Sequence, residues 1–277
     1  MHNNPVHTNE QNAAMAFSQQ AGIFDELYSS DGIIRYKRQR VRDHVKRWLA
    51  PASNILELNS GTGEDAIWFA NAGHLVHATD ISENMQQVLE RKVKTNNLEA
   101  RISYELCSFT HLQKLRYKGP YDMIFSNFAG LNCTGELNKS LSQFSSLLKP
   151  GGIVTLVILP PFCLWEFLLI FKGMFRTATR RLLNKNGSSA KVSGNHFKCW
   201  YYKPSYVTNC LKEEFTLLSV EALCTIVPPS YISGFADKHP RKFKWLKEKE
   251  NKWKDKWPWK YIGDYYIISL QKRAIPN

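Results

Sequence analysis

Apolar residues in the middle of the chain alternate between short continuous runs and longer stretches with helical spacing. The continuous runs predict strands at 54–58, 75–79, 101–106, 121–126 and 152–158. Apolar residues three and four positions apart predict the intervening helices, at 63–72, 83–96, 111–115 and 135–147. Strands that alternate with helices favour a doubly wound α/β fold, in which a parallel sheet has helices on both faces.

The flanking sequence predicts additions to this core. Helices at 13–29 and 31–49 form an expected N-terminal cap, and Asp31 is a suitable N-cap for the second. Residues 1–12 are polar and are expected to lack regular structure. Apolar runs at 215–226 and 261–270 would complete a seven-stranded, mostly parallel sheet.

Two insertions are expected after the fifth and sixth strands. The first holds an apolar helix over 162–174 and then a basic helix, and the second holds a helix over 240–256. We expect one domain over 1–277. Its parts are a helical cap at 1–50, a ligand-binding core at 51–159, the first insertion at 160–203 and a C-terminal part of the sheet at 204–277, with the second insertion at 228–260.

Composition narrows the class of protein. The chain has 277 residues, of which 43% are apolar, as in ordinary globular domains. Its six cysteines show no C-x-x-C spacing, so we expect reduced thiols, no metal and a cytoplasmic location. Pro160, Pro161 and Glu166 interrupt the apolar stretch 152–171, which favours a buried strand and a helix over a membrane span.

The net charge of +13 is concentrated in three basic runs, at 35–47, 172–185 and 238–260. The third run is interleaved with tryptophan and phenylalanine. Such runs attract nucleic acid, anionic lipid or acidic metabolites, or they form solvated helix faces.

The first strand runs into a tight turn, Gly61-Thr62-Gly63, and then into a helix. Glycine is needed where the backbone turns sharply and a ligand comes close to it. A P-loop is excluded because no Gly-Lys-Ser/Thr follows. The third glycine of a dinucleotide fingerprint is missing, and Glu64 and Asp65 would repel a pyrophosphate. These acids suit a cationic or zwitterionic ligand, although the glycines alone are also explained by packing.

Asp80 ends the second strand 17 residues after Gly63, where a ribose-binding acid is expected. Together with the E-x-x-x-G-x-G loop from Glu57, the segment 121–128 and the Pro-Gly-Gly turn at 150–152, it resembles the class I S-adenosylmethionine-dependent methyltransferases, a Rossmann-like family. The four motifs stand in family order over roughly residues 53 to 159.

The resemblance implies S-adenosylmethionine as cofactor and a role for each matching residue. The methionyl loop would comprise Glu57, Asn59, Gly61 and Gly63. Asp80 would bind the ribose, Ile81 and Met85 would flank the adenine, and Asn127 would face the methyl group. Tyr28, with Phe24, resembles an aromatic pair that closes over the cofactor, and core packing is the alternative.

The loop after the third strand departs from the family pattern. The family often places an acid there to bind the adenine amine, whereas this chain has Cys107-Ser108-Phe109. Ser108 and Phe109 are the expected contacts, with backbone groups supplying the rest.

Methyl transfer from a sulfonium depends mainly on positioning, because the methyl carbon is already activated. A general base is needed only for an acceptor that is protonated in its reactive form. His196 and Glu166, in the first insertion, are the candidate catalytic residues, and a structural role is the alternative for each. His111 is expected to be merely exposed.

The aromatic insertions favour a small organic or lipid-linked acceptor, methylated on oxygen or else on nitrogen. RNA is an alternative, although Ser126-Asn127-Phe128-Ala129 is not the Asn/Asp-Pro-Pro-aromatic motif of base amine methyltransferases. A second alternative is a scaffold that binds the cofactor without catalysing a reaction. The apolar helix beside basic residues also allows peripheral contact with the inner membrane surface. The oligomeric state stays open.

Overall fold

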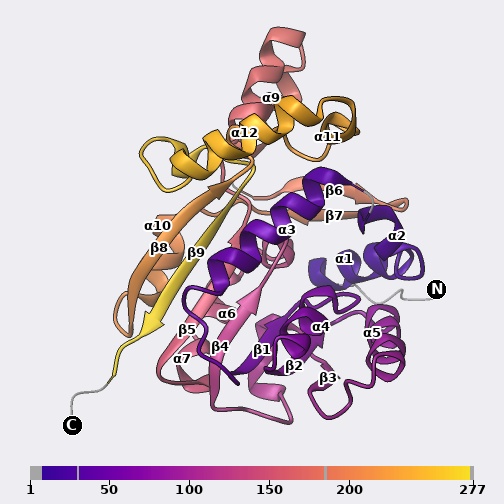
Figure 1. Ribbon diagram of the computed structural model, residues 1–277, viewed down its shortest axis with the longest axis vertical. Coiled ribbons are helices and arrows are strands. Elements are labelled where there is room, and N and C mark those ends of the chain that lie inside the picture. Colours follow the sequence, from indigo (N-terminus) through magenta and orange to yellow (C-terminus); the bar gives the residue numbers. More distant parts are fainter. Residues whose placement is uncertain (1–7, 30, 184–185, 275–277) are drawn as a thin grey trace, which may run out of the picture.

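Seven strands form one mixed sheet in the computed structural model, which describes residues 8–29, 31–183 and 186–274 (Figure 1). Their order is β3-β2-β1-β4-β5-β9-β8. Strands β1 to β5 run parallel, and β9 is antiparallel to both of its neighbours. This topology confirms the predicted doubly wound, mostly parallel sheet. The strands are β1 (Asn54–Leu58), β2 (Leu75–Asp80), β3 (Ile102–Leu106), β4 (Tyr121–Ser126), β5 (Leu148–Ile158), β8 (Phe215–Leu223) and β9 (Tyr265–Lys272).

Strand side chains alternate between two apolar clusters, one on each face of the sheet. In β1, Ile55 belongs to one cluster, and Leu56 and Leu58 belong to the other, as the two-residue period of a strand requires. One face is covered by α3 (Gly32–Val45), α4 (Glu64–Asn71) and α5 (Glu83–Thr95). The other is covered by η1 (Phe109–Lys114), α6 (Leu137–Leu141), α7 (Phe144–Leu147) and α10 (Pro204–Leu211). Helices on both faces are therefore confirmed.

The N-terminal cap begins earlier than expected and is divided. Helix α1 (Asn9–Ser18) starts with a capping box between Thr8 and Gln11, so residues 9–12 are helical, and residues 1–7 lie outside the described ranges. The expected helix at 13–29 is broken before α2 (Phe24–Ser29). Asp31 caps α3 as predicted, because its side chain accepts the N–H groups of Ile33 and Ile34.

The first insertion contains short helices and a hairpin. Two short segments, α8 (Leu164–Phe167) and η3 (Leu168–Lys172), replace the expected apolar helix, and α9 (Phe175–Leu183) is the expected basic helix. Strands β6 (Ser188–Val192) and β7 (Asn195–Cys199) pair around Ser193 and Gly194, which both have positive φ. This two-residue turn was not predicted. Within the described ranges, every helix is too short or too polar for a membrane span.

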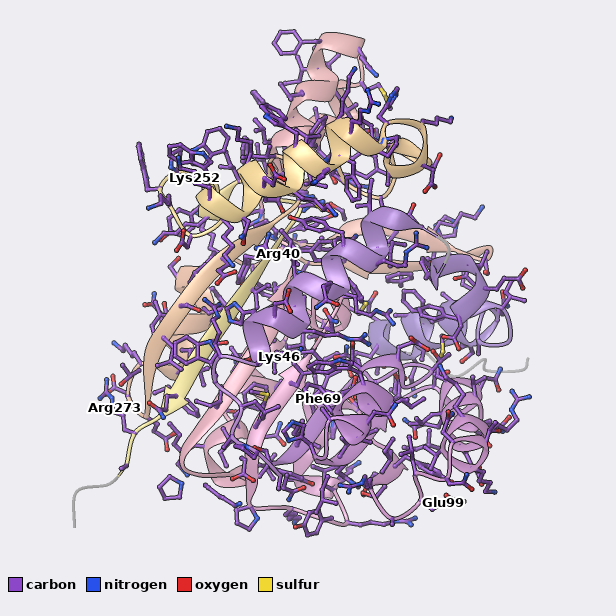
Figure 2. All side chains as sticks on the ribbon, in the orientation of Figure 1. Arg40, Lys46, Phe69, Glu99, Lys252 and Arg273 are labelled. Carbon is purple, nitrogen blue, oxygen red and sulfur yellow. The ribbon has the colours of Figure 1, made fainter. Side chains whose placement is uncertain are left out.

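The second insertion contains α11 (Phe235–Lys238), α12 (Pro240–Trp253) and η4 (Trp259–Tyr261). Glu250 of α12 fastens it to the end of β8, because its carboxylate accepts the four backbone N–H groups of residues 224–227 at 2.8 to 3.0 Å. The hydroxyl of Tyr36 donates to the same group at 3.0 Å. Figure 2 shows Arg40 between α3 and α12, and its guanidinium lies 3.4 Å from Glu250.

Replacing Glu250 by alanine is expected to lower the free energy of unfolding by about 3–5 kcal/mol, because buried N–H groups and a buried guanidinium lose their acceptor. Urea unfolding measures the change. Glu248→Ala is the matched control, since Glu248 is exposed on the same helix, and it should shift stability by less than about 0.5 kcal/mol. Equal losses in the two variants would show that Glu250 does not hold the insertion in place.

Candidate active site

A cavity lies at the edge of the sheet where the parallel strands end. Its free space is about 910 Å³, a volume that includes open solvent at the mouth of the cavity. Of the predicted cofactor residues, the structure brings together at its wall Glu57, Asn59, Gly61, Asp80, Ile81, Met85, Phe109 and Asn127. Further wall residues, which the sequence did not single out as cofactor contacts, include Glu10, Ala13, Ala14, Phe17, Arg38, Asp65, Phe128 and Cys133.

The two glycines of the turn after β1 have different roles. Gly61 has a φ of +55°, and a Cβ placed on it would meet no atom within 4 Å, so its backbone faces open space in the cavity wall. Gly63 has a φ of +81°, and a Cβ there would lie 2.1 Å from Cδ1 of Leu89. Gly63 therefore lets α4 and α5 pack closely. It is not among the residues that line the cavity, and its contact with the cofactor stays a prediction.

Asp80 ties the turn after β1 to the end of β2. Its carboxylate accepts the N–H of Gly61 at 2.9 Å and the N–H of Ser82 at 2.8 Å. Burial raises the pKa of the Asp80 carboxyl, and these N–H groups partly oppose the rise. A carboxylate has about four acceptor positions, so Asp80 keeps capacity for hydroxyl donors from a ligand in the cavity.

Glu57 is buried with an unsatisfied oxygen. The residue is 3% exposed, and its Oε2 has no hydrogen-bond partner. Burial raises the pKa of this carboxyl well above its usual value, and Asp65 adds to the rise, against the charges of Arg38 and Arg42. A buried carboxylate oxygen without a donor is costly. The site therefore fits a ligand that brings a donor or a positive charge, as the ammonium group of a methionyl moiety does.

The cavity wall carries an excess of acid. Five carboxylates line it against one guanidinium, that of Arg38; they are Glu10, Glu57, Glu64, Asp65 and Asp80. Part of this charge is compensated nearby, because Glu64 pairs with Arg38 at 2.9 Å and with Lys92 at 2.6 Å, and Asp65 pairs with Arg42 at 3.0 Å. The negative charge that remains favours a cationic ligand, as Glu64 and Asp65 in the first turn of α4 predicted.

The loop after β4 is held in an unfavourable backbone conformation at the cavity wall. Phe128, Ala129 and Asn59 all have positive φ, at 47°, 63° and 47°. Asn59 joins the two loops, since its Nδ2 donates to the carbonyl of Asn127 at 3.2 Å and its Oδ1 accepts from Ser126 at 2.8 Å. Such residues cost on the order of 1 kcal/mol or more each, and they gather at ligand sites.

Helix α1 forms the opposite wall of the cavity, with one helical face of Glu10, Ala13, Ala14 and Phe17. Asn9 fastens the helix by donating to the carbonyls of Cys133 and Lys198 at 2.6 and 2.9 Å. Ala13, Ala14 and Phe17 belong to the helix predicted over 13–29, whereas Glu10 was missed because residues 1–12 are polar. The Thr8-x-x-Gln11 capping box was the signal that predicts a helix start there.

Two predicted contacts lie beside the cavity. The hydroxyl of Ser108 caps η1 by accepting the N–H of Thr110, and it also donates to Glu10. Tyr28 packs on Phe24, with the ring centroids 4.6 Å apart, and faces a neighbouring depression. Of this aromatic pair, Phe24 reaches the cavity.

Neither predicted base lies at the cavity wall. His196 is exposed on β7, opposite Lys191. Glu166 is buried, and its carboxylate binds Arg180 and Arg181 at 2.6 Å each. Although burial raises the pKa of Glu166, the hydrogen bond from Arg180 and the charge of Arg181 bring it below its usual value. Glu166 is thus an internal ion-pair partner away from this cavity, and the role of these two residues as bases stays a prediction.

Cys163, Glu166 and Asp264 offer a group of possible metal ligands within 4.8 Å of one another. The two acids are already joined by Arg181, which lies 2.6 Å from Glu166 and 2.7 Å from Asp264. Burial raises the pKa of the Cys163 thiol to about 12. The guanidinium of Arg181 pairs with both acids, and the thiol of Cys163 stays protonated. This group therefore has a structural role.

Residues 55–152 match a family of methyltransferase domains. Demethylmenaquinone methyltransferase from Leptospira interrogans is 29% identical over 102 residues, which cover 36% of this chain and 40% of that protein. The enzyme of the same name from Bacteroides fragilis is 30% identical over 182 residues, which cover 62% of this chain and 71% of that protein. The match thus spans well under half the length of the first relative and over two thirds of the second.

Among solved structures, magnesium protoporphyrin IX methyltransferase from Synechocystis, with bound SAH (S-adenosylhomocysteine), superposes with a TM-score of 0.60. The superposition covers 96% of this chain and 100% of that one at 16% identity. At 16% identity, this superposition shows that the two proteins share a fold.

Replacing Glu57 by glutamine is expected to stabilise the ligand-free protein at about pH 8 by about 1–3 kcal/mol, because a neutral amide replaces a buried carboxyl whose ionised form is unfavourable there. In the unfolded chain the carboxyl of Glu57 loses its proton above its usual pKa of about 4.3, whereas burial in the folded chain favours the protonated form. The ionised group therefore costs stability as the pH rises, and the advantage of glutamine should shrink towards pH 4.

Urea unfolding across this pH range measures the effect. Glu64→Gln is the control, because Glu64 lines the same cavity but is paired with Arg38 and Lys92, and it should bring no gain. A loss of stability in Glu57→Gln at about pH 8 would contradict the view of Glu57 as an unsatisfied acid.

Proposed function

The chain belongs to the class I S-adenosylmethionine-dependent methyltransferases, and from that premise we propose that it methylates a small, largely apolar acceptor. S-adenosylmethionine is the cofactor of the family, and the buried acids at the sheet edge fit it. When bound, it supplies an electrophilic methyl group on a positively charged sulfur. The protein's part is to orient the two reactants and exclude water.

The cavity wall offers contacts for each part of this cofactor. Asp80 would accept the ribose hydroxyls, and Glu57 would accept the methionyl ammonium. Ile81, Met85 and Phe109 would hold the adenine between apolar surfaces. All five residues line the same cavity.

Glu10 is the candidate for the acid that the loop after β3 lacks. Its carboxylate accepts the hydroxyls of Ser108 and Thr110, at the start of η1, and it lines the cavity. An acid from α1 therefore stands beside the loop from which relatives present theirs. We assign to Glu10 the recognition of the adenine amine.

The observation that favours an apolar acceptor is that the acidic part of the cavity adjoins an apolar part. Ala13, Ala14 and Phe17 of α1, with Phe24 and Phe128, supply the apolar surface. Both curated relatives are named for demethylmenaquinone. The acceptor class that we propose is a quinol-like or lipid-linked aromatic ring that carries a hydroxyl group, or else an amine, as the methyl acceptor.

The same wall disfavours the alternative acceptors. A cavity with five carboxylates and one guanidinium repels the phosphates of RNA. Membership in an enzyme family favours turnover over a cofactor-binding scaffold. Among the described residues, the wall has no histidine, lysine or tyrosine, and burial raises the pKa of the Cys133 thiol, which leaves it protonated. The cavity therefore best fits methyl acceptors that lose their proton without help from a base of the protein.

Incubation with methyl-labelled S-adenosylmethionine and a panel of phenols, naphthols and quinols is expected to transfer label to one of them. Asp80→Asn should lower the transfer about tenfold or more at limiting cofactor, because an acceptor for the ribose hydroxyls is weakened. Asp43→Asn is the control, since Asp43 is exposed on α3. Labelling of RNA in place of the panel would overturn the proposed acceptor class.

Glu10→Ala is expected to weaken binding of S-adenosylhomocysteine about tenfold or more, the effect of losing a hydrogen bond to a charged group. The inosine analogue lacks the adenine amine, so the variant should lose the preference of the wild type for the adenine form. Calorimetry with both ligands separates this role from a looser α1, which would weaken both equally. Glu26→Ala, on the exposed side of α2, should keep the preference.

A further inference from the structure

One end of the molecule carries a cluster of exposed apolar side chains on η3 and α9. We call residues 168–183 the tip, because Figure 1 shows α9 at the end of the longest axis. Phe171, Phe175 and Leu183 are 84%, 62% and 74% exposed, and Leu168, Met174 and Leu182 are also exposed. Single exposed apolar residues are ordinary, but a contiguous group of this kind marks an interaction surface.

The charge around the tip is positive. Lys172 and Arg176 are exposed between its apolar residues. Glu166, the only acid in residues 160–183, is buried and already paired with Arg180 and Arg181. The exposed surface of the tip therefore combines large apolar side chains with cations, and none of the described residues 160–183 is an exposed acid.

Helix α12 adds charge of the same sign at the same end of the molecule (Figure 1). Its exposed residues include Lys242, Lys244, Lys249 and Lys252, with Lys252 labelled in Figure 2. Trp245 and Trp257 are 55% and 79% exposed beside these lysines in the sequence. Tryptophan and lysine together are typical of surfaces that rest in the headgroup region of a bilayer.

We propose that this end of the protein docks onto an anionic lipid surface, with the tip in the headgroup region and the cations on the lipid phosphates. Apolar side chains enter the boundary of the acyl chains, and lysine and arginine are attracted to the anionic leaflet. A second copy of the chain is a poorer partner, because its tip has the same charge. Single-stranded nucleic acid would stack its bases on Phe171 and Phe175, but it offers no apolar layer for the exposed aliphatic side chains of Leu168, Met174, Leu182 and Leu183.

Docking in this manner directs the cavity edge of the sheet towards the lipid. The first insertion leaves the sheet at the carboxyl end of β5. The second leaves at the carboxyl end of β8, which points the same way because both strands are antiparallel to β9. The cavity lies at this same edge. The docking itself does not rest on the proposed activity and is tested without cofactor or acceptor.

The test is flotation of the full chain with vesicles of phosphatidylcholine alone or mixed equally with phosphatidylglycerol. The wild type should float only with the anionic vesicles, and less so as salt is added. Phe171→Ser with Phe175→Ser should lower the partition coefficient about tenfold or more. Lys172→Glu with Arg176→Glu should do the same.

Leu75→Ser is the matched control, since Leu75 is 48% exposed at the start of β2, and it should float like the wild type. Unchanged thermal melting shows that each variant is folded. The proposal is overturned if the wild type stays unbound on anionic vesicles or if the tip variants float equally well. It is also overturned if the wild type is a dimer that Phe171→Ser with Phe175→Ser converts to monomers, because the tip would then bind a second copy.

Discussion

Carboxylates buried where the parallel strands end are the constraint on which the rest of the site depends. A doubly wound sheet brings the ends of β1, β2 and β4 to one edge, so Glu57, Asp80 and Asn127 meet there. The protein satisfies Asp80 with backbone N–H groups but leaves Oε2 of Glu57 without a donor. A buried carboxyl oxygen without a donor lowers the stability of the free protein, and it strengthens the binding of a ligand that carries a positive charge.

The N-terminal cap turns this edge into an enclosed site. Helix α1 places one face over the cavity, and it is fastened to the rest of the chain by Asn9 and by the contact between Ser18 and Ser82 at 2.5 Å. The same helix brings Glu10 to the loop after β3. Helix α1 thus both encloses the cavity and reaches the proposed adenine site. The first insertion, at the same edge of the sheet, carries the exposed tip.

The core of the fold and the acids at its edge were predictable from sequence because their signals are local. Alternating apolar runs predict β1 to β5, and Glu57, Gly61 and Asp80 stand at fixed spacings around one turn. The surroundings of other residues depend on distant partners and could not be predicted in this way. Gly63 is required by Leu89, and Glu166 is neutralised by arginines that only tertiary packing brings to it. The polarity of α1 hid Glu10, although its capping box was visible at Thr8 and Gln11.

The most direct test of this account is calorimetric titration of the wild-type protein with S-adenosylhomocysteine at several pH values between about 5 and 8, in two buffers at each pH that differ in ionisation enthalpy. The ligand's ammonium should favour the ionised form of Glu57, whose pKa burial raises well above its usual value in the free protein. The account predicts binding accompanied by release of a proton. Absence of binding at millimolar ligand, or binding with no release of a proton, would contradict it.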